Sequence, residues 1–193
     1  MNNSFGDSKT SLQINQNLLY FSIPRRFDEI QIDLFNEADI SEEYLTWLND
    51  QKHMQFSDQR FKSHTQDSSL EYIKSFEGTP NLFLKVSNTS GVMVGTLTAY
   101  IDVEELTHAC GILIGPRFSR AGYGKRAWFA MTHQICPALG ARKVVAGTLE
   151  NNLAMVKLFE FSDMNFDARV RGENFYSGHQ VDVLMYSRLL SAV

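Results

Sequence analysis

The chain has 193 residues and a formal net charge of −4, with 44% hydrophobic and 21% charged residues. This composition predicts a soluble globular domain with a sizeable core and excludes a disordered chain. The negative charge and the shortness of the basic clusters, such as Pro24-Arg25-Arg26, argue against a nucleic-acid-binding protein.

The first half of the chain predicts an arm, a strand and two helices. Residues 1–19 are polar and without period, so we expect a flexible N-terminal arm before a single domain at 20–193. Apolar and polar residues alternate from Ile30 to Phe35, which predicts a strand. Ser41 begins a predicted helix. An aromatic-rich segment without period leads to a second predicted helix at 67–77.

The second half alternates strands and helices. Its predicted elements, in order, are strands at 81–86, 92–100 and 107–115, a helix at 122–136, a strand at 144–149, a helix at 152–162, and strands at 164–171 and 180–189. This order predicts a mixed α/β layer whose first half is antiparallel.

Location and metal content are constrained by what the sequence lacks. No apolar run approaches the ~20 residues that cross a bilayer, and no basic-then-apolar signal opens the chain. Cys110 and Cys136 lie in apolar surroundings and are expected to be buried free thiols. No His or Cys spacing is typical of a metal site. We therefore expect a cytoplasmic protein without metal and without membrane contact.

A glycine-bearing turn lies between the predicted strand at 107–115 and the helix that follows. Its sequence is Ser119-Arg120-Ala121-Gly122-Tyr123-Gly124. A turn that opens a helix directs unpaired backbone N–H groups at one point, which suits a phosphate group. The turn comes too late for a dinucleotide fold, and Gly124-Lys125-Arg126 lacks the hydroxyl of a nucleotide-binding P-loop.

Two motifs resemble those of the GNAT N-acetyltransferases. The run from Ile114 to Gly124 is similar to that family's acetyl-CoA motif, and the run from Asn152 to Glu160 is similar to its Asn-x-x-Ala/Ser-x-x-Leu-Tyr-Glu motif. The resemblance covers about residues 28–190. It implies a mostly antiparallel, twisted sheet of about seven strands, splayed at the cofactor strand, with about four helices. It also implies acetyl-CoA as the cofactor.

The resemblance assigns a set of cofactor-binding residues. The strand would pair with the pantetheine arm, the turn would hold the pyrophosphate, and the later helix would complete the site. These residues are Ile112, Leu113, Ile114, Ser119, Arg120, Ala121, Gly122, Tyr123, Gly124, Lys125, Asn152 and Phe159. Phe159 stands where many members carry a tyrosine that protonates the leaving thiolate, and phenylalanine cannot donate a proton. Ser119 and Arg120 also depart from the family pattern.

The proton acceptor is left open by the sequence. Glu150 follows the strand at 144–149, His108 begins the cofactor strand, and His64 lies in the segment that by resemblance covers the acceptor. Each is a candidate catalytic base. A water relay without a side-chain base also fits, because positioning alone supplies much of the rate.

The acceptor is predicted from aromatic residues around Arg60. The candidate acceptor residues are Trp47, Phe56, Arg60, Phe61 and Tyr176. Arg60 matches phosphate and stacks on rings, which favours a nucleotide-linked amino sugar. The chain resembles the ribosomal-protein N-terminal and amino-sugar branches of the family, so a protein N-terminus is the alternative. Asp50, Asp58 and Asp102 could receive its ammonium group. A non-catalytic acyl-CoA sensor and a homodimer also remain open.

Overall fold

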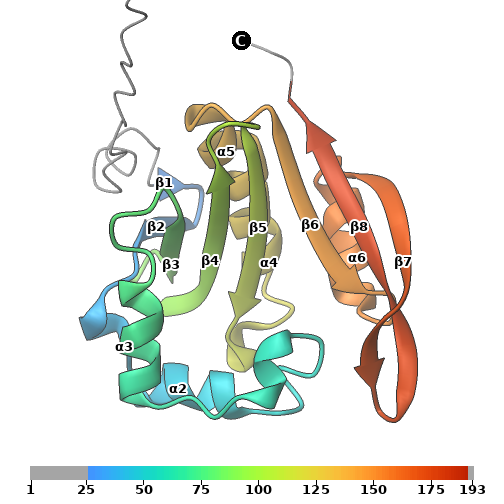
Figure 1. Ribbon diagram of the computed structural model, residues 1–193. Coiled ribbons are helices and arrows are strands. Elements are labelled where there is room, and N and C mark those ends of the chain that lie inside the picture. The colour runs from blue at the N-terminus through green and yellow to red at the C-terminus, as the bar shows by residue number, and fades with distance from the viewer. Residues whose placement is uncertain (1–25, 191–193) are drawn as a thin grey trace, which may run out of the picture.

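The computed structural model describes residues 26–190, so the predicted arm at 1–19 lies outside the described residues (Figure 1). The elements, in chain order, are β1 (Arg26–Phe27), β2 (Ile30–Leu34), η1 (Glu37–Asp39), α2 (Glu42–Asn49), η2 (Asp58–Phe61), α3 (Gln66–Lys74), β3 (Leu82–Asn88), β4 (Met93–Asp102), β5 (Thr107–Ile114), η3 (Pro116–Phe118), α4 (Tyr123–Ala130), η4 (Met131–Ile135), α5 (Cys136–Ala138), β6 (Lys143–Leu149), α6 (Leu153–Phe161), β7 (Asn165–Tyr176) and β8 (His179–Leu189).

The strands of the described region form one eight-stranded sheet in the order β1-β2-β3-β4-β5-β6-β8-β7. Every neighbouring pair is antiparallel except β5 and β6, which run parallel. The predicted mixed α/β fold is confirmed. The sheet has one strand more than the approximate seven expected, because the two-residue strand β1 pairs with the start of β2.

The sheet opens between β5 and β6. Their pairing is limited to Thr107–Ala109 on β5 and Lys143–Val145 on β6. Both strands continue beyond that point, β5 to Ile114 and β6 to Leu149, and they diverge as they do so (Figure 1). The second half of β5 therefore has a strand partner on its β4 side only, which exposes backbone groups on the other side.

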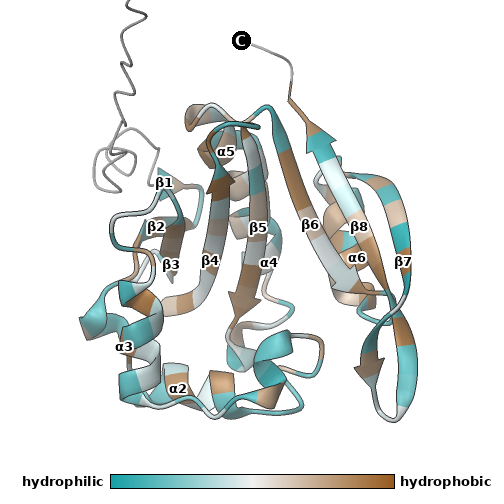
Figure 2. Ribbon diagram, viewed as in Figure 1, coloured by the Kyte–Doolittle hydropathy of each residue, from teal (hydrophilic) through white to brown (hydrophobic). Residues whose placement is uncertain are grey.

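Two hydrophobic clusters hold the sheet in place. The larger one packs the sheet against α4, η4 and α6, with Trp128, Met131 and Phe159 fully buried. The smaller one packs α2 and α3 against β3, where Phe83 stacks on Phe35 with ring centroids 4.6 Å apart. Figure 2 shows brown, hydrophobic stretches on the central strands, and teal along much of α3 and the β7–β8 hairpin.

Three local features differ from the sequence-based elements. The helix expected at 122–136 is interrupted by a π-helical turn, η4. Strand β7 runs on to Tyr176 and contains two irregularities, after Phe166 and after Val170. The segment expected to lack regular structure between the first two helices contains the short 3-10 helix η2. Bulges and single turns leave no periodic signal in the sequence.

Candidate active site

The glycine-bearing turn forms the N-terminus of α4. Gly122 caps the helix with φ +85°, and Arg120 has φ +64°. The first turn of a helix leaves N–H groups without intrahelical acceptors, here those of Tyr123, Gly124 and Lys125. A Cβ atom on Gly122 would lie 2.5 Å from Nη1 of Arg126. The positive φ of Gly122 therefore favours glycine at this position, and the turn presents the backbone donors that an anion needs.

The side chains around this turn pack locally. Tyr123 meets Phe118 edge to face, with ring centroids 6.1 Å apart. Nζ of Lys125 lies 4.3 Å from the ring centroid of Phe161. These contacts keep both side chains near the turn. The turn itself contributes backbone N–H groups to an anion site.

The gap between β5 and β6 is a groove of about 680 Å³, which we call the donor groove. Its walls are formed by Cys110–Ile114 of β5, Gly147–Leu149 of β6, the start of α6, and the segment before η2. Ser119 lines the end of the groove nearest the α4 turn. The predicted strand and part of the turn thus border one continuous space.

The hydrogen-bond alternation of β5 decides which backbone groups face this groove. The N–H of Gly115 donates to the carbonyl of Val94 at 2.9 Å, continuing the β4–β5 ladder. In an antiparallel pair such residues alternate, so Leu113 also points its backbone groups at β4. Those of Ile112 and Ile114 point toward the open side. They can bind an extended chain as another strand would.

Asn152 lines the donor groove and also caps α6. Its Oδ1 accepts the N–H of Met155 at 3.3 Å, and its Nδ2 donates to Oγ1 of Thr148 at 3.0 Å. The amide is thereby fixed in orientation at the groove wall, and one N–H remains available to a ligand.

Phe159 does not lie in the groove. Its ring is fully buried between Trp128 and Tyr186, with centroid distances of 5.7 and 5.0 Å. Met155 and Leu158 of the same helix line the groove instead. The expectation that Phe159 contacts the cofactor is corrected accordingly. Its apolar ring packs in the main core, where a tyrosine hydroxyl would need a partner.

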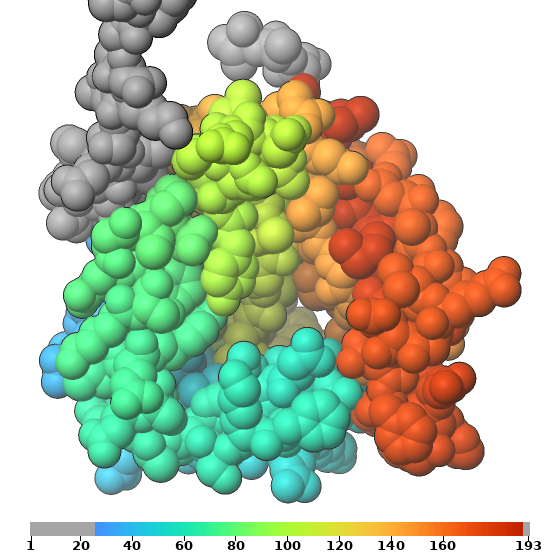
Figure 3. All heavy atoms as spheres, in the orientation of Figure 1, coloured from blue at the N-terminus to red at the C-terminus, as the bar shows by residue number. Residues whose placement is uncertain are grey.

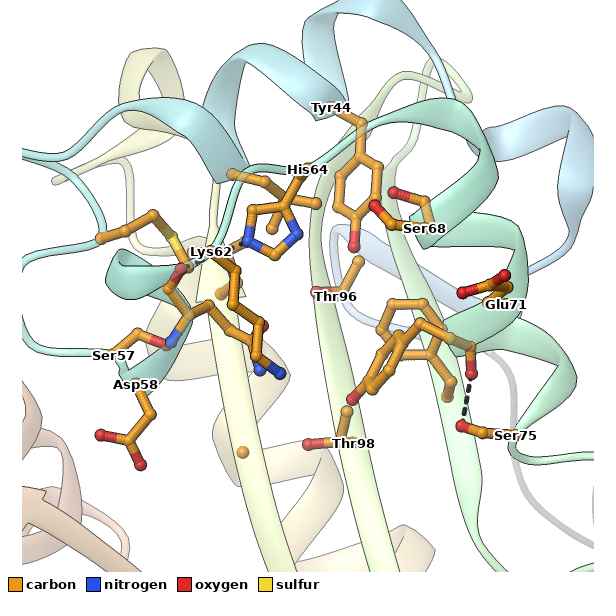
Figure 4. Close-up of a pocket in the computed structure, with 18 of the residues that line it drawn as sticks. Tyr44, Ser57, Asp58, Lys62, His64, Ser68, Glu71, Ser75, Thr96 and Thr98 are labelled. Carbon is orange, nitrogen blue, oxygen red and sulfur yellow. Dashed lines mark hydrogen bonds between the residues drawn. The ribbon is translucent and has the colours of Figure 1, made fainter.

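A second cavity of about 760 Å³ lies on the opposite side of β5, and we call it the acceptor cavity. Most of its polar lining consists of hydroxyl groups. They come from Tyr44, Ser57, Ser63, Ser68, Ser69, Tyr72, Ser75, Thr96, Thr98 and Tyr100. The titratable side chains of its lining other than tyrosine are Asp58, Lys62, His64 and Glu71. In Figure 4, Lys62, His64 and Tyr44 extend toward a shared central space.

Burial sets the protonation of the tyrosines in this cavity. The hydroxyls of Tyr72 and Tyr100 lie 2.9 Å apart. Burial raises the pKa of Tyr44 and of Tyr72 well above the ordinary tyrosine value. These groups stay neutral at physiological pH and act as hydrogen-bond donors and acceptors.

The two cavities meet at β5. Six residues line both of them: Met54, Ser57, Asp58, Gly111, Ile112 and Leu113. Asp58 is the one titratable member of this shared set, and 81% of its side chain is exposed. A molecule in the donor groove and another in the acceptor cavity can therefore approach each other over Gly111–Leu113.

The three predicted base candidates occupy different environments. His64 lines the acceptor cavity, and its Nε2 lies 3.3 Å from the carbonyl oxygen of Gln59. Glu150 lines neither cavity, and its Oε2 accepts a hydrogen bond of 2.5 Å from Arg169. Since that guanidinium also binds Asp182 at 2.9 Å, Glu150 belongs to a surface ion-pair network.

His108 is inside the sheet. It is 1% exposed, its Nδ1 has no hydrogen-bond partner, and burial lowers its pKa to about 4. His108 lines neither cavity, because residue 108 belongs to the part of β5 that still pairs with β6. This position argues against His108 as the catalytic base.

The predicted acceptor residues do not line the acceptor cavity. Trp47 is 3% exposed and packs beneath Gly115, where an added Cβ would come within 2.4 Å of its ring. Arg60 is held by the carbonyl of Ser57 at 2.8 Å and that of Phe175 at 3.3 Å, and its Cζ lies 4.1 Å above the ring of Phe61. Phe61 is 73% exposed.

Phe56 and Tyr176 stack on each other, with ring centroids 5.7 Å apart. Phe56 borders the donor groove rather than the acceptor cavity. Lys62, Glu71 and the hydroxyl-bearing residues of the acceptor cavity were not predicted from the sequence. Ordinary polar residues on α3 and β4 give no local signal of a shared cavity, which depends on contacts distant in the sequence.

The sequence matches the family model of the acetyltransferase (GNAT) domain over residues 30–165. The match spans more than half of the chain, so the protein belongs to the GNAT acetyltransferase family. It is an N-acetyltransferase. No curated protein sequence matches it.

Three similar solved structures illustrate the fold. A GNAT acetyltransferase from Bacillus anthracis has 16% identity and a TM-score of 0.73, covering 85% of this chain and 96% of that one. The Salmonella typhimurium acetyltransferase that modifies the N-terminal serine of ribosomal protein L7/L12 has 15% identity and a TM-score of 0.74, covering 88% and 99%. Spermidine N-acetyltransferase from Vibrio cholerae, in complex with CoA and spermine, has 17% identity and a TM-score of 0.72, covering 84% and 96%.

Two further observations concern the described residues. None of their helices is long and apolar enough to cross a membrane. Within the same part of the chain, no group of three or more His, Cys, Asp or Glu side chains is arranged to hold a metal ion. Cys110 and Cys136 are free cysteines whose Sγ atoms lie 3.5 Å apart.

Proposed function

We propose that the protein transfers the acetyl group of acetyl-CoA, bound in the donor groove, to the primary amine of a nucleotide-linked amino sugar in the acceptor cavity. The observation that carries this proposal is the junction of the two cavities over Gly111–Leu113. A thioester lying along β5 would be exposed to an amine arriving from the opposite side. Positioning of this kind supplies roughly 7–11 kcal/mol in favourable cases.

The chain's own groups support direct transfer. Backbone N–H groups of Ile112 and Ile114 face the donor groove, and Ile112 also belongs to the junction. This favours the Ile112 N–H as the donor that polarises the thioester carbonyl. Asp58 and His64 both line the acceptor cavity. In this proposal Asp58 binds the ammonium form of the amine and His64 accepts its proton. The assignments of Ile112–Ile114, Ser119–Lys125 and Asn152 to acetyl-CoA binding remain predictions.

The chemistry of the acceptor cavity supports a sugar. Hydroxyl groups that can both donate and accept hydrogen bonds suit a polyhydroxylated ligand. Lys62 makes no ion pair within residues 26–190 and extends into the cavity (Figure 4), where it could bind a phosphate. It takes the role first assigned to Arg60.

A protein N-terminus is the second candidate acceptor. Asp58 and Glu71 place two carboxylates in the lining of the acceptor cavity, and an N-terminal ammonium needs such a partner. The similarity to the ribosomal L7/L12 acetyltransferase agrees with this alternative. The cytoplasmic location and the homodimer stay predictions.

Release of the CoA thiol, followed with a chromogenic disulfide, tests the acceptor. The panel is a nucleotide-linked amino sugar, the free amino sugar, a peptide with a free N-terminus, and spermidine. We expect the highest kcat/KM with the nucleotide-linked sugar. Faster turnover of the peptide or of spermidine would overturn the sugar assignment, and binding of acetyl-CoA without turnover of any amine would contradict enzymatic transfer.

Substitution of Lys62 tests whether this residue binds the phosphates of a nucleotide-linked sugar. Lys62→Gln should raise KM for the nucleotide-linked sugar roughly ten- to hundredfold and leave KM for the free amino sugar unchanged, since a charged hydrogen bond contributes about 1.5–3 kcal/mol. Lys74→Gln, at an exposed position at the end of α3, is the matched control. Equal effects of Lys62→Gln on both sugars would argue against a phosphate at Lys62.

A further inference from the structure

Residues 52–61, which we call the strap, run from α2 toward the tip of the β7–β8 hairpin. The Tyr176 hydroxyl donates to Oε1 of Gln55 at 2.6 Å. Phe56 stacks on Tyr176, and Nη2 of Arg60 donates to the carbonyl of Phe175 at 3.3 Å. These contacts tie the strap to the hairpin. In Figure 3 the two segments meet below a hollow beside the central strands.

The strap forms the outer wall of the donor groove. Its residues Lys52–Asp58 line the groove on one side, and Cys110–Ile114 of β5 line it on another. A chain that pairs with the outward-facing backbone groups of Ile112 and with the N–H of Ile114 would have its other edge directed away from β5. In the pantetheine arm, the edge that faces away from β5 also carries amide groups. These amide groups require hydrogen-bond partners once they are shielded from water.

His53 is the strap residue with an unused hydrogen-bonding atom. Its ring lines the donor groove, and its Nε2 is buried without a partner. Burial lowers the pKa of His53, while nearby Asp50 and a hydrogen bond at the Ile114 backbone act in the opposite direction. A neutral imidazole has a single N–H, which in the Nδ1–H tautomer can be directed at the Ile114 carbonyl. The unpartnered nitrogen is then a lone-pair acceptor.

We propose that His53 accepts a hydrogen bond from an amide N–H of the pantetheine arm of CoA, and that the hairpin tip positions His53 by holding the strap across the donor groove. His53 is a binding residue in this scheme, and Tyr176 is a positioning residue that acts through the strap. The proposal rests on the assignment of the donor groove and is independent of the acceptor.

Calorimetric binding of CoA to the full chain tests the contact. His53→Leu keeps an apolar side chain of moderate size and removes the acceptor, whereas His53→Gln retains an acceptor oxygen. We expect His53→Leu to raise Kd for CoA roughly three- to tenfold, as loss of one hydrogen bond would. His53→Gln should recover part of the affinity. Neither variant should change Kd for adenosine 3′,5′-bisphosphate, which lacks the pantetheine arm.

The positioning role predicts a coupling. Tyr176→Phe removes the hydroxyl that binds Gln55 and should raise Kd for CoA less than His53→Leu does. In the His53→Leu background it should add little, because Tyr176 acts on the arm through His53. Tyr100→Phe is the matched control, since it removes a hydroxyl bound to Tyr72 outside the donor groove and should leave Kd for CoA unchanged.

The outcomes separate this inference from the assignment of the groove. If the unmodified protein fails to bind CoA, both are wrong. If it binds CoA and His53→Leu binds equally well, the contact is wrong and the groove assignment stands. If His53→Leu weakens adenosine 3′,5′-bisphosphate as much as CoA, the effect does not come from the arm, and the proposal is also overturned. Additive losses in the double variant would overturn the role of Tyr176.

Discussion

At the scale of single residues, position in the fold decides what three of the histidines can do. His64 borders the acceptor cavity, His53 borders the donor groove, and His108 is closed inside the sheet without a partner for Nδ1. The three residues are the same chemically. Their environments separate them into a candidate base, a candidate ligand contact and a buried neutral side chain.

His108 should make folding sensitive to acid. Burial lowers its folded-state pKa to about 4, below the ordinary histidine value of about 6.5. Between those pH values the unfolded chain binds the proton and the folded chain does not, so stability falls as pH falls through that window. The predicted loss is about 3 kcal/mol at roughly 1.4 kcal/mol per pKa unit. Urea unfolding at pH 7 and pH 5 should show about 2 kcal/mol of this loss, because the folded-state pKa lies below pH 5.

His108→Leu should reduce this pH dependence, because it removes the titrating group without exposing the site. Burial also lowers the pKa of His53 and His133, so some slope will remain. His179→Gln, at an exposed position of β8, should keep the slope of the unmodified protein. An unchanged slope in His108→Leu would refute the assignment.

Residue identity predicted some of these roles and missed others. The glycine pattern around Gly122 identified the turn, because a left-handed conformation before a helix is a local property. His53 carries no local signal, and its environment depends on Ile114 far along the chain. Trp47 and Phe159 were assigned from aromatic character and family position, and both serve the cores instead.

At the scale of elements, the start of α4 combines strain with binding. Gly122 adopts φ +85°, which costs other residues about 1–2 kcal/mol. We expect Gly122→Ala to lower stability by about that amount and to weaken CoA binding, since the turn must move. Thermal unfolding and calorimetry measure the two effects.

Gly78 provides the control for Gly122. It has φ +70° and no atom within 4 Å of an added Cβ, and it lies in the turn before β3, outside both cavities. Gly78→Ala should cost similar stability and leave CoA affinity unchanged. Equal loss of CoA affinity in both variants would show that general destabilisation, not the turn, controls binding.

The order of the elements was predictable, and their long-range contacts were not. Alternation and helical spacing located most strands and helices of residues 26–190. The strap joins Gln55 to Tyr176, which are 121 positions apart. Such a contact follows from the completed sheet, with β8 paired to β6, rather than from either local sequence.

At the scale of the whole molecule, the two cavities lie on opposite sides of β5 and share its surface. Both substrates can therefore be bound together. Among the shared residues the candidate nucleophiles are Ser57, which caps η2 by accepting the N–H of Gln59, and Asp58. This arrangement favours direct transfer over an acetylated enzyme.

Direct transfer predicts sequential kinetics. With the acceptor that the thiol-release panel identifies, double-reciprocal plots at several acetyl-CoA concentrations should intersect. Parallel lines would indicate a covalent acetyl-enzyme, and mass spectrometry of the protein incubated with acetyl-CoA alone would then show a stable gain of one acetyl group. Neither result depends on the variants above.

The short pairing of β5 with β6 also has a mechanical consequence. The halves β1–β5 and β6–β8 are joined within the sheet by three residue pairs at one end, and by the contacts of the strap at the other. The donor groove therefore lies between two halves of the sheet that are connected at both of its ends. We expect that a small change of angle at the pivot, Thr107–Ala109 against Lys143–Val145, would alter the width of the groove at its far end. Substitutions at that pivot can therefore change the width available to a ligand without touching it.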